Sequence, residues 1–151
     1  MHDSQDAMTA GRVQFVAAAV IVSTPIWMAV GWLHARYAAP VLASPEDQGA
    51  TESICRILLV IGVLTALGSL SLRKSLETRL LGRSATLADK MRVILIAMSV
   101  AETAGIMGLV CALLTHQLTV PFILWGCSLG VSILHFPTRA WLEKGNGPPI
   151  A

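Results

Sequence analysis

The sequence predicts an all-α, polytopic integral membrane protein with four transmembrane helices in two hairpins. Of its 151 residues, 54% are hydrophobic and only 13% are charged, and that charged fraction is about half the value for an ordinary soluble domain. The apolar residues also gather in four long runs, each near the roughly 20 residues that a helix needs to cross about 30 Å of hydrocarbon. A backbone inside lipid must satisfy its own hydrogen bonds, so each run is expected to be a helix.

The apolar runs cover residues 13–33, 54–72, 93–115 and 120–136. They predict helices at 13–36, 54–73, 91–115 and 119–136, with polar tails at 1–12 and 137–151. The first two helices are expected to form one hairpin and the last two another. Because the first run follows Asp3 and Asp6 and is longer than the apolar region of a signal peptide, we expect it to be retained. Cleavage near Ala43 is the alternative.

The basic residues predict the orientation. Nine of the eleven Lys and Arg residues fall on one side of the four predicted spans: Arg12, Arg73, Lys74, Arg79, Arg83, Lys90, Arg92, Arg139 and Lys144. Since cytoplasmic loops carry the excess of Lys and Arg, both termini are expected in the cytoplasm. The basic segment 73–92 also has leucines at near-helical spacing, so it is either a solvated linker or an amphipathic helix that lies at the interface or docks a partner.

Glu102 is the only acidic residue inside the four predicted spans. It lies ten residues after Arg92, which at about 1.5 Å per residue places it about 15 Å along the third helix, near the bilayer midplane. A charged carboxylate at that depth is costly unless it is paired or hydrated, and no Lys or Arg lies at a similar depth. The neutral acid is therefore favoured, and Glu102 is predicted to be a proton-binding site.

Small residues surround Glu102 in the sequence. A stripe at helical spacing predicts a face that another helix approaches closely, and it consists of Ala97, Ala101, Gly105, Gly108 and Ala112. Ser99 and Thr103 are candidate supporting groups that could bond locally to the carboxyl. The structural alternative is a protonated Glu102 that only fixes packing by a hydrogen bond to Ser23, Thr65 or Ser128.

The sequence offers only weak candidates for a haem site and none for a metal, nucleotide or catalytic site. His34 and His116 lie near the outer ends of the first and third helices and are weak haem candidates. The three cysteines have no CxxC spacing, so they are interpreted as small apolar residues and no metal site is predicted. No phosphate-binding glycine loop and no Ser/His/Asp or HExxH pattern is present. No cofactor, no nucleic-acid partner and no covalent catalysis is expected.

Residues Ala101 to Leu114 read AETAGIMGLVCALL. This stretch resembles the carboxylate helix of rotary ATP synthase ring subunits, the proteolipid or c subunits, with the pattern A-E-x-x-x-I-x-G-L-V-x-A-L-L. The resemblance covers about residues 92–115 and implies that Glu102 matches the ion-carrying carboxylate. The chain is also similar to small four-helix bacterial membrane proteins with an AE…GL third helix and a last helix ending in LHFP, here 134–137. That likeness implies a bacterial inner membrane.

Three functional hypotheses follow. The first is a small c-subunit-like membrane protein that binds a proton at Glu102 within a larger membrane complex, with lipid and other membrane subunits as its partners. The second is a structural or accessory transmembrane subunit in which Glu102 only packs helices. The third is a haem or quinone anchor built on the histidines.

Overall fold

The computed structural model describes residues 2–38, 45–81, 86–115 and 117–143, and every regular element in those ranges is a helix. The four main helices are α1 (His2–Tyr37), α2 (Pro45–Leu80), α3 (Leu87–Thr115) and α4 (Thr119–His135). A single turn, α5 (Arg139–Glu143), follows α4. The prediction of an all-α chain is confirmed.

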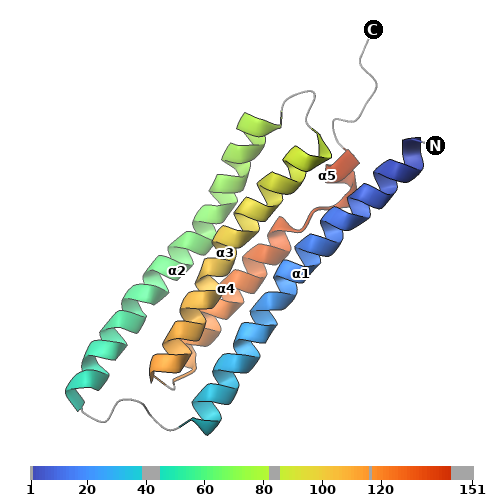
Figure 1. Ribbon diagram of the computed structural model, residues 1–151. Coiled ribbons are helices and arrows are strands. Elements are labelled where there is room, and N and C mark those ends of the chain that lie inside the picture. The colour runs from blue at the N-terminus through green and yellow to red at the C-terminus, as the bar shows by residue number, and fades with distance from the viewer. Residues whose placement is uncertain (1, 39–44, 82–85, 116, 144–151) are drawn as a thin grey trace.

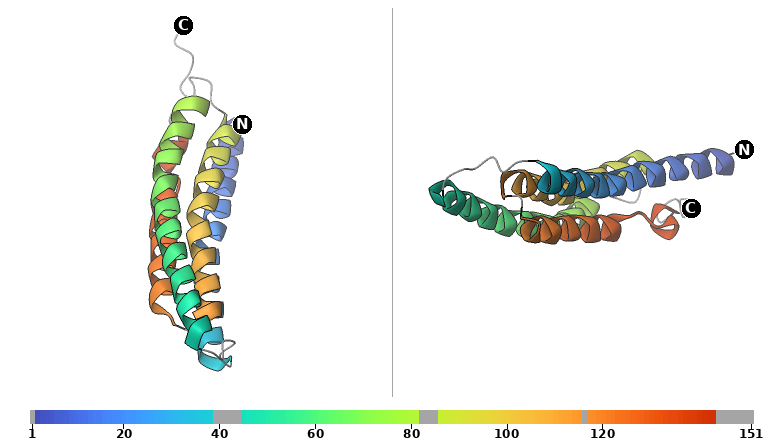
Figure 2. Two further views of the ribbon diagram at one scale, coloured as in Figure 1. Left: turned by 90° about the vertical axis from the view of Figure 1, so that its left-hand side faces the viewer. Right: turned by 90° about the horizontal axis from the view of Figure 1, so that it is seen from below.

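The main helices form a two-layer bundle, with α1 beside α3 in one layer and α2 beside α4 in the other (Figures 1 and 2). The chain runs up and down, so α1 and α3 start at the end of the bundle where both chain termini lie (Figure 1). We call this the termini end. Helix α3 is central because it packs against α1, α2 and α4.

The predicted pairing into two hairpins is correct for α3 and α4 and wrong for α1 and α2. Helices α3 and α4 are antiparallel neighbours in direct contact, but α1 and α2 form no comparable interface and lie on opposite sides of the α3–α4 pair (Figure 1). The reason lies in the helix surfaces. In an 18-residue apolar stretch of each helix, 44% of the residues are buried in α3, against 17% in α1 and 22% in α2. Helices α1 and α2 thus each keep most of their surface free and pack on α3 and α4 rather than on each other.

The helices α1 and α2 extend well beyond the predicted spans, with 36 residues each. Helix α2 continues to Leu80, through the first eight residues of the basic segment 73–92 that was expected to connect the second and third spans, and α3 takes in the last six from Leu87. An ion pair one turn apart, Arg73 Nε to Glu77 Oε1 at 2.8 Å, supports this extension. Hydropathy identifies only the part of a helix that suits lipid. Because the charged ends of a helix lower the hydropathy, the predicted spans are shorter than the observed helices.

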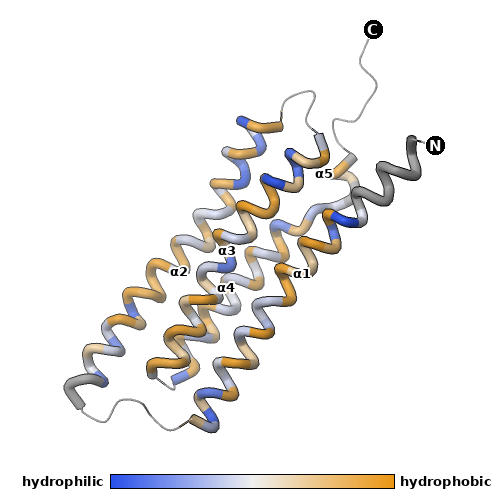
Figure 3. The backbone as a smooth tube through the Cα atoms, in the orientation of Figure 1, coloured by the Kyte–Doolittle hydropathy of each residue, from blue (hydrophilic) through white to orange (hydrophobic). Residues whose placement is uncertain are grey.

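Hydrophobic residues predominate along the middle of the helices, and hydrophilic residues gather toward the ends (Figure 3). Large apolar side chains point outward on every main helix, for example Phe15, Leu64, Ile106 and Leu134. By length and composition, α1, α2 and α3 can each cross a membrane, and α4 is apolar but has only 17 residues. An apolar exterior of this extent is typical of a protein that contacts lipid.

Two apolar clusters form the interior. One joins α2, α3 and α4 around Leu124, Ala104 and Cys111. The other lies nearer the termini end and joins α1, α3 and α5 around Ala17, Met98 and Leu142. The fully buried polar side chains of α4, those of Ser128, Ser132 and His135, lie outside both clusters.

Candidate functional site

Glu102 lies near the middle of α3, half-buried where α3 packs against α1. Its Oε1 accepts a hydrogen bond from the indole Nε1 of Trp27 in α1, at 3.3 Å. We call this place the α1–α3 seam. The carboxyl is thus not sealed in the bundle interior: one side meets α1, and part of it stays open at the surface.

The hydrogen-bond partner of Glu102 differs from the three that the structural alternative named. Ser23 donates to the carbonyl of Val20, at 2.6 Å, and Thr65 donates within its own helix. Ser128 instead forms a contact with Thr24, at 3.5 Å. The indole of Trp27 was not anticipated, because an apolar helix gives no sign of which way a Trp N–H points.

No cation neutralises Glu102 in the described part of the chain. The ion pairs there join Arg56 to Glu52, Arg73 to Glu77 and Arg92 to Asp89, all away from the middle of α3. A Trp N–H can only donate, and its bond suits either a carboxylate or the carbonyl oxygen of a neutral acid. In apolar surroundings with one neutral donor, the neutral acid is the less costly form.

The two candidate supporting residues do not reach the carboxyl. Thr103 donates its hydroxyl to the carbonyl of Ser99, at 3.2 Å, so this bond stays inside α3. Ser99 itself is exposed. Neither side chain is bonded to Glu102 among the described residues.

All five small residues of the stripe are buried: Ala97, Ala101, Gly105, Gly108 and Ala112. Gly105 and Gly108 contact the indole of Trp125 in α4, whose Nε1 donates to the carbonyl of Gly105 at 3.0 Å. A methyl group on Gly108 would lie 2.9 Å from that nitrogen, and one on Gly31 of α1 would lie 2.7 Å from the same ring. The glycines therefore form a slot for a fully buried Trp.

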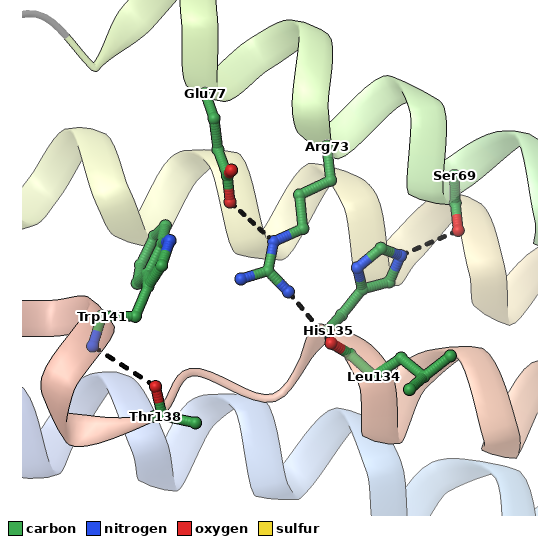
Figure 4. Close-up of polar contacts among 7 residues, drawn as sticks. All are labelled: Ser69, Arg73, Glu77, Leu134, His135, Thr138 and Trp141. Atoms are coloured by element: carbon green, nitrogen blue, oxygen red, sulfur yellow. Dashed lines mark hydrogen bonds and ion pairs between the residues drawn. The ribbon is translucent and has the colours of Figure 1, made fainter.

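A second polar cluster lies toward the termini end, between α2 and the end of α4 (Figure 4). Arg73 binds Glu77 and also donates to the carbonyl of Leu134, at 3.1 Å. Its guanidinium lies over the ring of Trp141, 5.2 Å from the centroid. Arg73 thus satisfies one of the carbonyls left open at the end of α4 and holds the following turn against α2.

His135, the last residue of α4, is fully buried in this cluster. Its Nε2 lies 2.8 Å from Ser69 Oγ, and Ser69 lies 2.6 Å from the carbonyl of Ala66. Since the Ser69 hydroxyl proton goes to that carbonyl, His135 must donate from Nε2. Its Nδ1 is then an acceptor, and neither this atom nor the hydroxyl of the buried Ser132 has a partner in the described residues. Each such atom costs about 1–3 kcal/mol.

Of the buried polar residues of α4, the sequence singled out only Ser128, as a possible hydrogen-bond partner of Glu102. Ser128, Ser132 and His135 are spaced by four and three residues, so they occupy one helical face. That spacing was a signal that could have been found. It was obscured because α4 is otherwise so apolar that single hydroxyls did not stand out.

The remaining candidates gain no support as ligand sites. His34 lies half-buried near the end of α1, and His116, its suggested haem partner, lies outside the described residues. Within the described ranges, no group of three or more His, Cys, Asp or Glu side chains could hold a metal ion. Cys55 and Cys111 are buried in the apolar cluster of α2, α3 and α4, and all three cysteines are free.

Comparison of the chain with protein-family models, with curated protein sequences and with solved structures finds no match.

Proposed function

We propose that this chain is a small integral membrane protein whose four main helices all cross the bilayer and whose Glu102 binds and releases a proton at the α1–α3 seam. In this proposal it acts as a subunit of a larger membrane complex. One observation supports the role most directly: a carboxyl in the middle of an apolar helix is only half-buried, and a single indole N–H is its hydrogen-bond partner.

The position of Glu102 suits reversible protonation. A carboxyl locked in the interior by several donors would stay in one state, whereas this one has a single donor and an open side. The open side faces the lipid-contacting surface, where a helix of a neighbouring subunit could approach it and offer a polar or cationic partner. The local resemblance to ring subunits supports the same role, because Glu102 matches their ion-carrying carboxylate.

The charge distribution supports cytoplasmic termini. Arg12, Arg73, Lys74 and Arg79 all belong to the termini end of the bundle, as do Lys90 and Arg92 at the start of α3. The opposite end has Arg36 and Arg56, and Arg56 is paired with Glu52 at 3.6 Å. By the positive-inside rule, the termini end faces the cytoplasm of the proposed bacterial inner membrane.

Carbodiimide labelling tests the proton-binding role. The full-length protein in liposomes is treated with an apolar carbodiimide between about pH 5 and about pH 9, the range in which strongly buried carboxyls can titrate, and modified residues are identified by mass spectrometry. Such reagents attack a protonated carboxyl in an apolar setting. We expect labelling at Glu102 that falls as the pH rises. Labelling should be lost in Glu102→Gln and kept in Glu52→Gln, which changes an exposed carboxyl at the opposite end.

The Trp27–Glu102 hydrogen bond also fits the structural alternative, in which Glu102 only holds α1 against α3. Gln retains an acceptor for the indole, whereas Trp27→Phe removes the donor. A purely structural role predicts that Trp27→Phe loosens α1 from α3, and that Glu102 does not titrate, so its labelling is either absent or the same at every pH. Labelling that does not fall as the pH rises, in a protein that is still folded, would therefore refute the proton-binding role and leave Glu102 as a packing residue.

A further inference from the structure

We infer that the buried polar face of α4 forms an internal path for water and protons, leading from the termini end to the depth of Glu102. The path consists of His135, Ser132 and Ser128 on α4, with Ser69 of α2 and Thr24 of α1 beside them. All five side chains are essentially inaccessible at the bundle surface. Its use to supply protons to Glu102 rests on the proposed function; the path itself does not.

Unsatisfied polar atoms are the first reason. Several hydroxyls in this bundle donate to a carbonyl one turn back in their own helix, as those of Thr65, Thr103 and Thr115 do. The hydroxyl of Ser132 does not take this option and has no partner in the described residues. His135 Nδ1, three residues along the same face, is also unpartnered. Ser132 is able to donate and His135 Nδ1 to accept, so each offers an open hydrogen-bonding position to a water molecule that enters this face.

The depth of these groups is the second reason. Ser128 packs directly on Gly105, because a side chain built on that glycine would begin 3.1 Å from Ser128 Oγ. Helices α3 and α4 are antiparallel, so one turn from Ser128 to Ser132 corresponds to about one turn back along α3, from Gly105 to Ala101 and Glu102. Ser132 therefore lies at about the same depth as the carboxyl, and His135 lies about one turn nearer the termini end.

The third reason is that polar groups continue at both ends of this face. Toward the termini end, His135 is followed by Arg73 and Glu77, whose side chains are partly exposed at 16% and 30% (Figure 4). Toward the middle, Ser128 contacts Thr24 at 3.5 Å, and Thr24 lies one turn before Trp27, the partner of Glu102. Polar groups thus line the interior from the solvated end to the neighbourhood of the seam.

Hydrogen–deuterium exchange in the infrared tests the path without reference to Glu102. In the full-length protein in liposomes, Ser132→Cys places a near-isosteric thiol on the path, and its S–H band is isolated by subtracting the wild-type spectrum. Ala17→Cys is the matched control, because Ala17 is equally buried but belongs to the apolar cluster of α1, α3 and α5. After transfer to heavy water, we expect the thiol at 132 to exchange at least about tenfold faster than the thiol at 17. The reason is that one hydrogen bond to water lowers the barrier to exchange enough to raise the rate by about a factor of ten. Equal, slow exchange at both positions would overturn the inference.

The same experiment separates the path from the proposed function. The neutral acid of Glu102 has a carbonyl band that Glu102→Gln removes. If that band exists, Ser132→Ala should slow its exchange about tenfold, and Ser71→Ala, which changes an exposed serine of α2, should not. A fast thiol at 132 with no Glu102 acid band would refute proton binding while the path stands. If the exchange rate of the Glu102 acid band is the same in Ser132→Ala as in the wild type, Glu102 gains its proton by another route. That result would contradict the supply of protons through the path.

Discussion

At the scale of single residues, the closest contacts in this bundle are made by glycine. Trp125 occupies a slot in which Gly31 and Gly108 leave no room for even one methyl group. Glycine carries a cost in helix stability of about 0.5–1 kcal/mol relative to alanine. Here that cost is offset by the contact area of a whole indole and by its hydrogen bond to Gly105.

Gly108→Ala should therefore destabilise the protein in spite of alanine's better helix propensity. The added methyl group meets Trp125 Nε1 at 2.9 Å and the Cβ atom of Leu124 at 3.2 Å, and overpacking of this kind costs about 1–3 kcal/mol. Gly126→Ala is the control, because nothing lies within 4 Å of a methyl group there. Thermal unfolding in detergent measures both variants. A Gly108→Ala protein as stable as Gly126→Ala would mean that the slot is looser than described.

Among the helices, α3 has a local capping motif that marks its start. Thr86 and Asp89 form a reciprocal capping pair: the Thr86 hydroxyl and backbone N–H donate to Asp89 Oδ2, at 2.7 and 3.1 Å, and the Asp89 N–H donates to Thr86 Oγ1 at 3.2 Å. This arrangement satisfies a backbone donor that the helix itself cannot. It fixes where α3 begins, and hence the register that places Glu102 at mid-helix.

Thr86→Ala should cost about 1 kcal/mol of stability, the usual loss for a helix cap. The effect should be local, so backbone amide exchange in the first turn of α3 is expected to accelerate while exchange near Glu102 stays unchanged. Thr78→Ala serves as the control, since the Thr78 hydroxyl donates to the carbonyl of Ser75 inside α2 and caps nothing. Equal effects of the two changes would argue against the cap.

At the scale of the whole molecule, the bundle places both termini at one end, and this makes topology testable. In the proposed orientation, a fluorescent protein fused after Ala151 should fluoresce in bacterial cells, and alkaline phosphatase fused there should be inactive. The reverse pattern is expected for fusions after Ala50, at the opposite end. This pattern requires α4 to cross the membrane, although it is the shortest apolar helix, with 17 residues. The same result at both positions would exclude the four-span topology.

Much of the fold followed from composition and periodicity. Long apolar runs predicted helices, and the spacing of small residues in α3 pointed to a face that proves to be buried. The pairing of α1 with α2 failed, because hydropathy does not rank helix faces by how well they pack. The predictions placed the start of α1 and both ends of α2 too far inward for a related reason: charged helical residues carry no apolar signal.

Composition along the chain was enough to predict a set of apolar helices and to identify Glu102 as the one carboxylate inside the four predicted spans. The tertiary structure was needed to show that Trp27 is the hydrogen-bond partner of Glu102 at the α1–α3 seam, and that Ser132 Oγ and His135 Nδ1 are buried with no partner among the described residues. These facts depend on which helix faces meet and at what register. Side-chain volumes fix that, above all the fit of Trp125 into its glycine slot, and one-dimensional patterns do not express it.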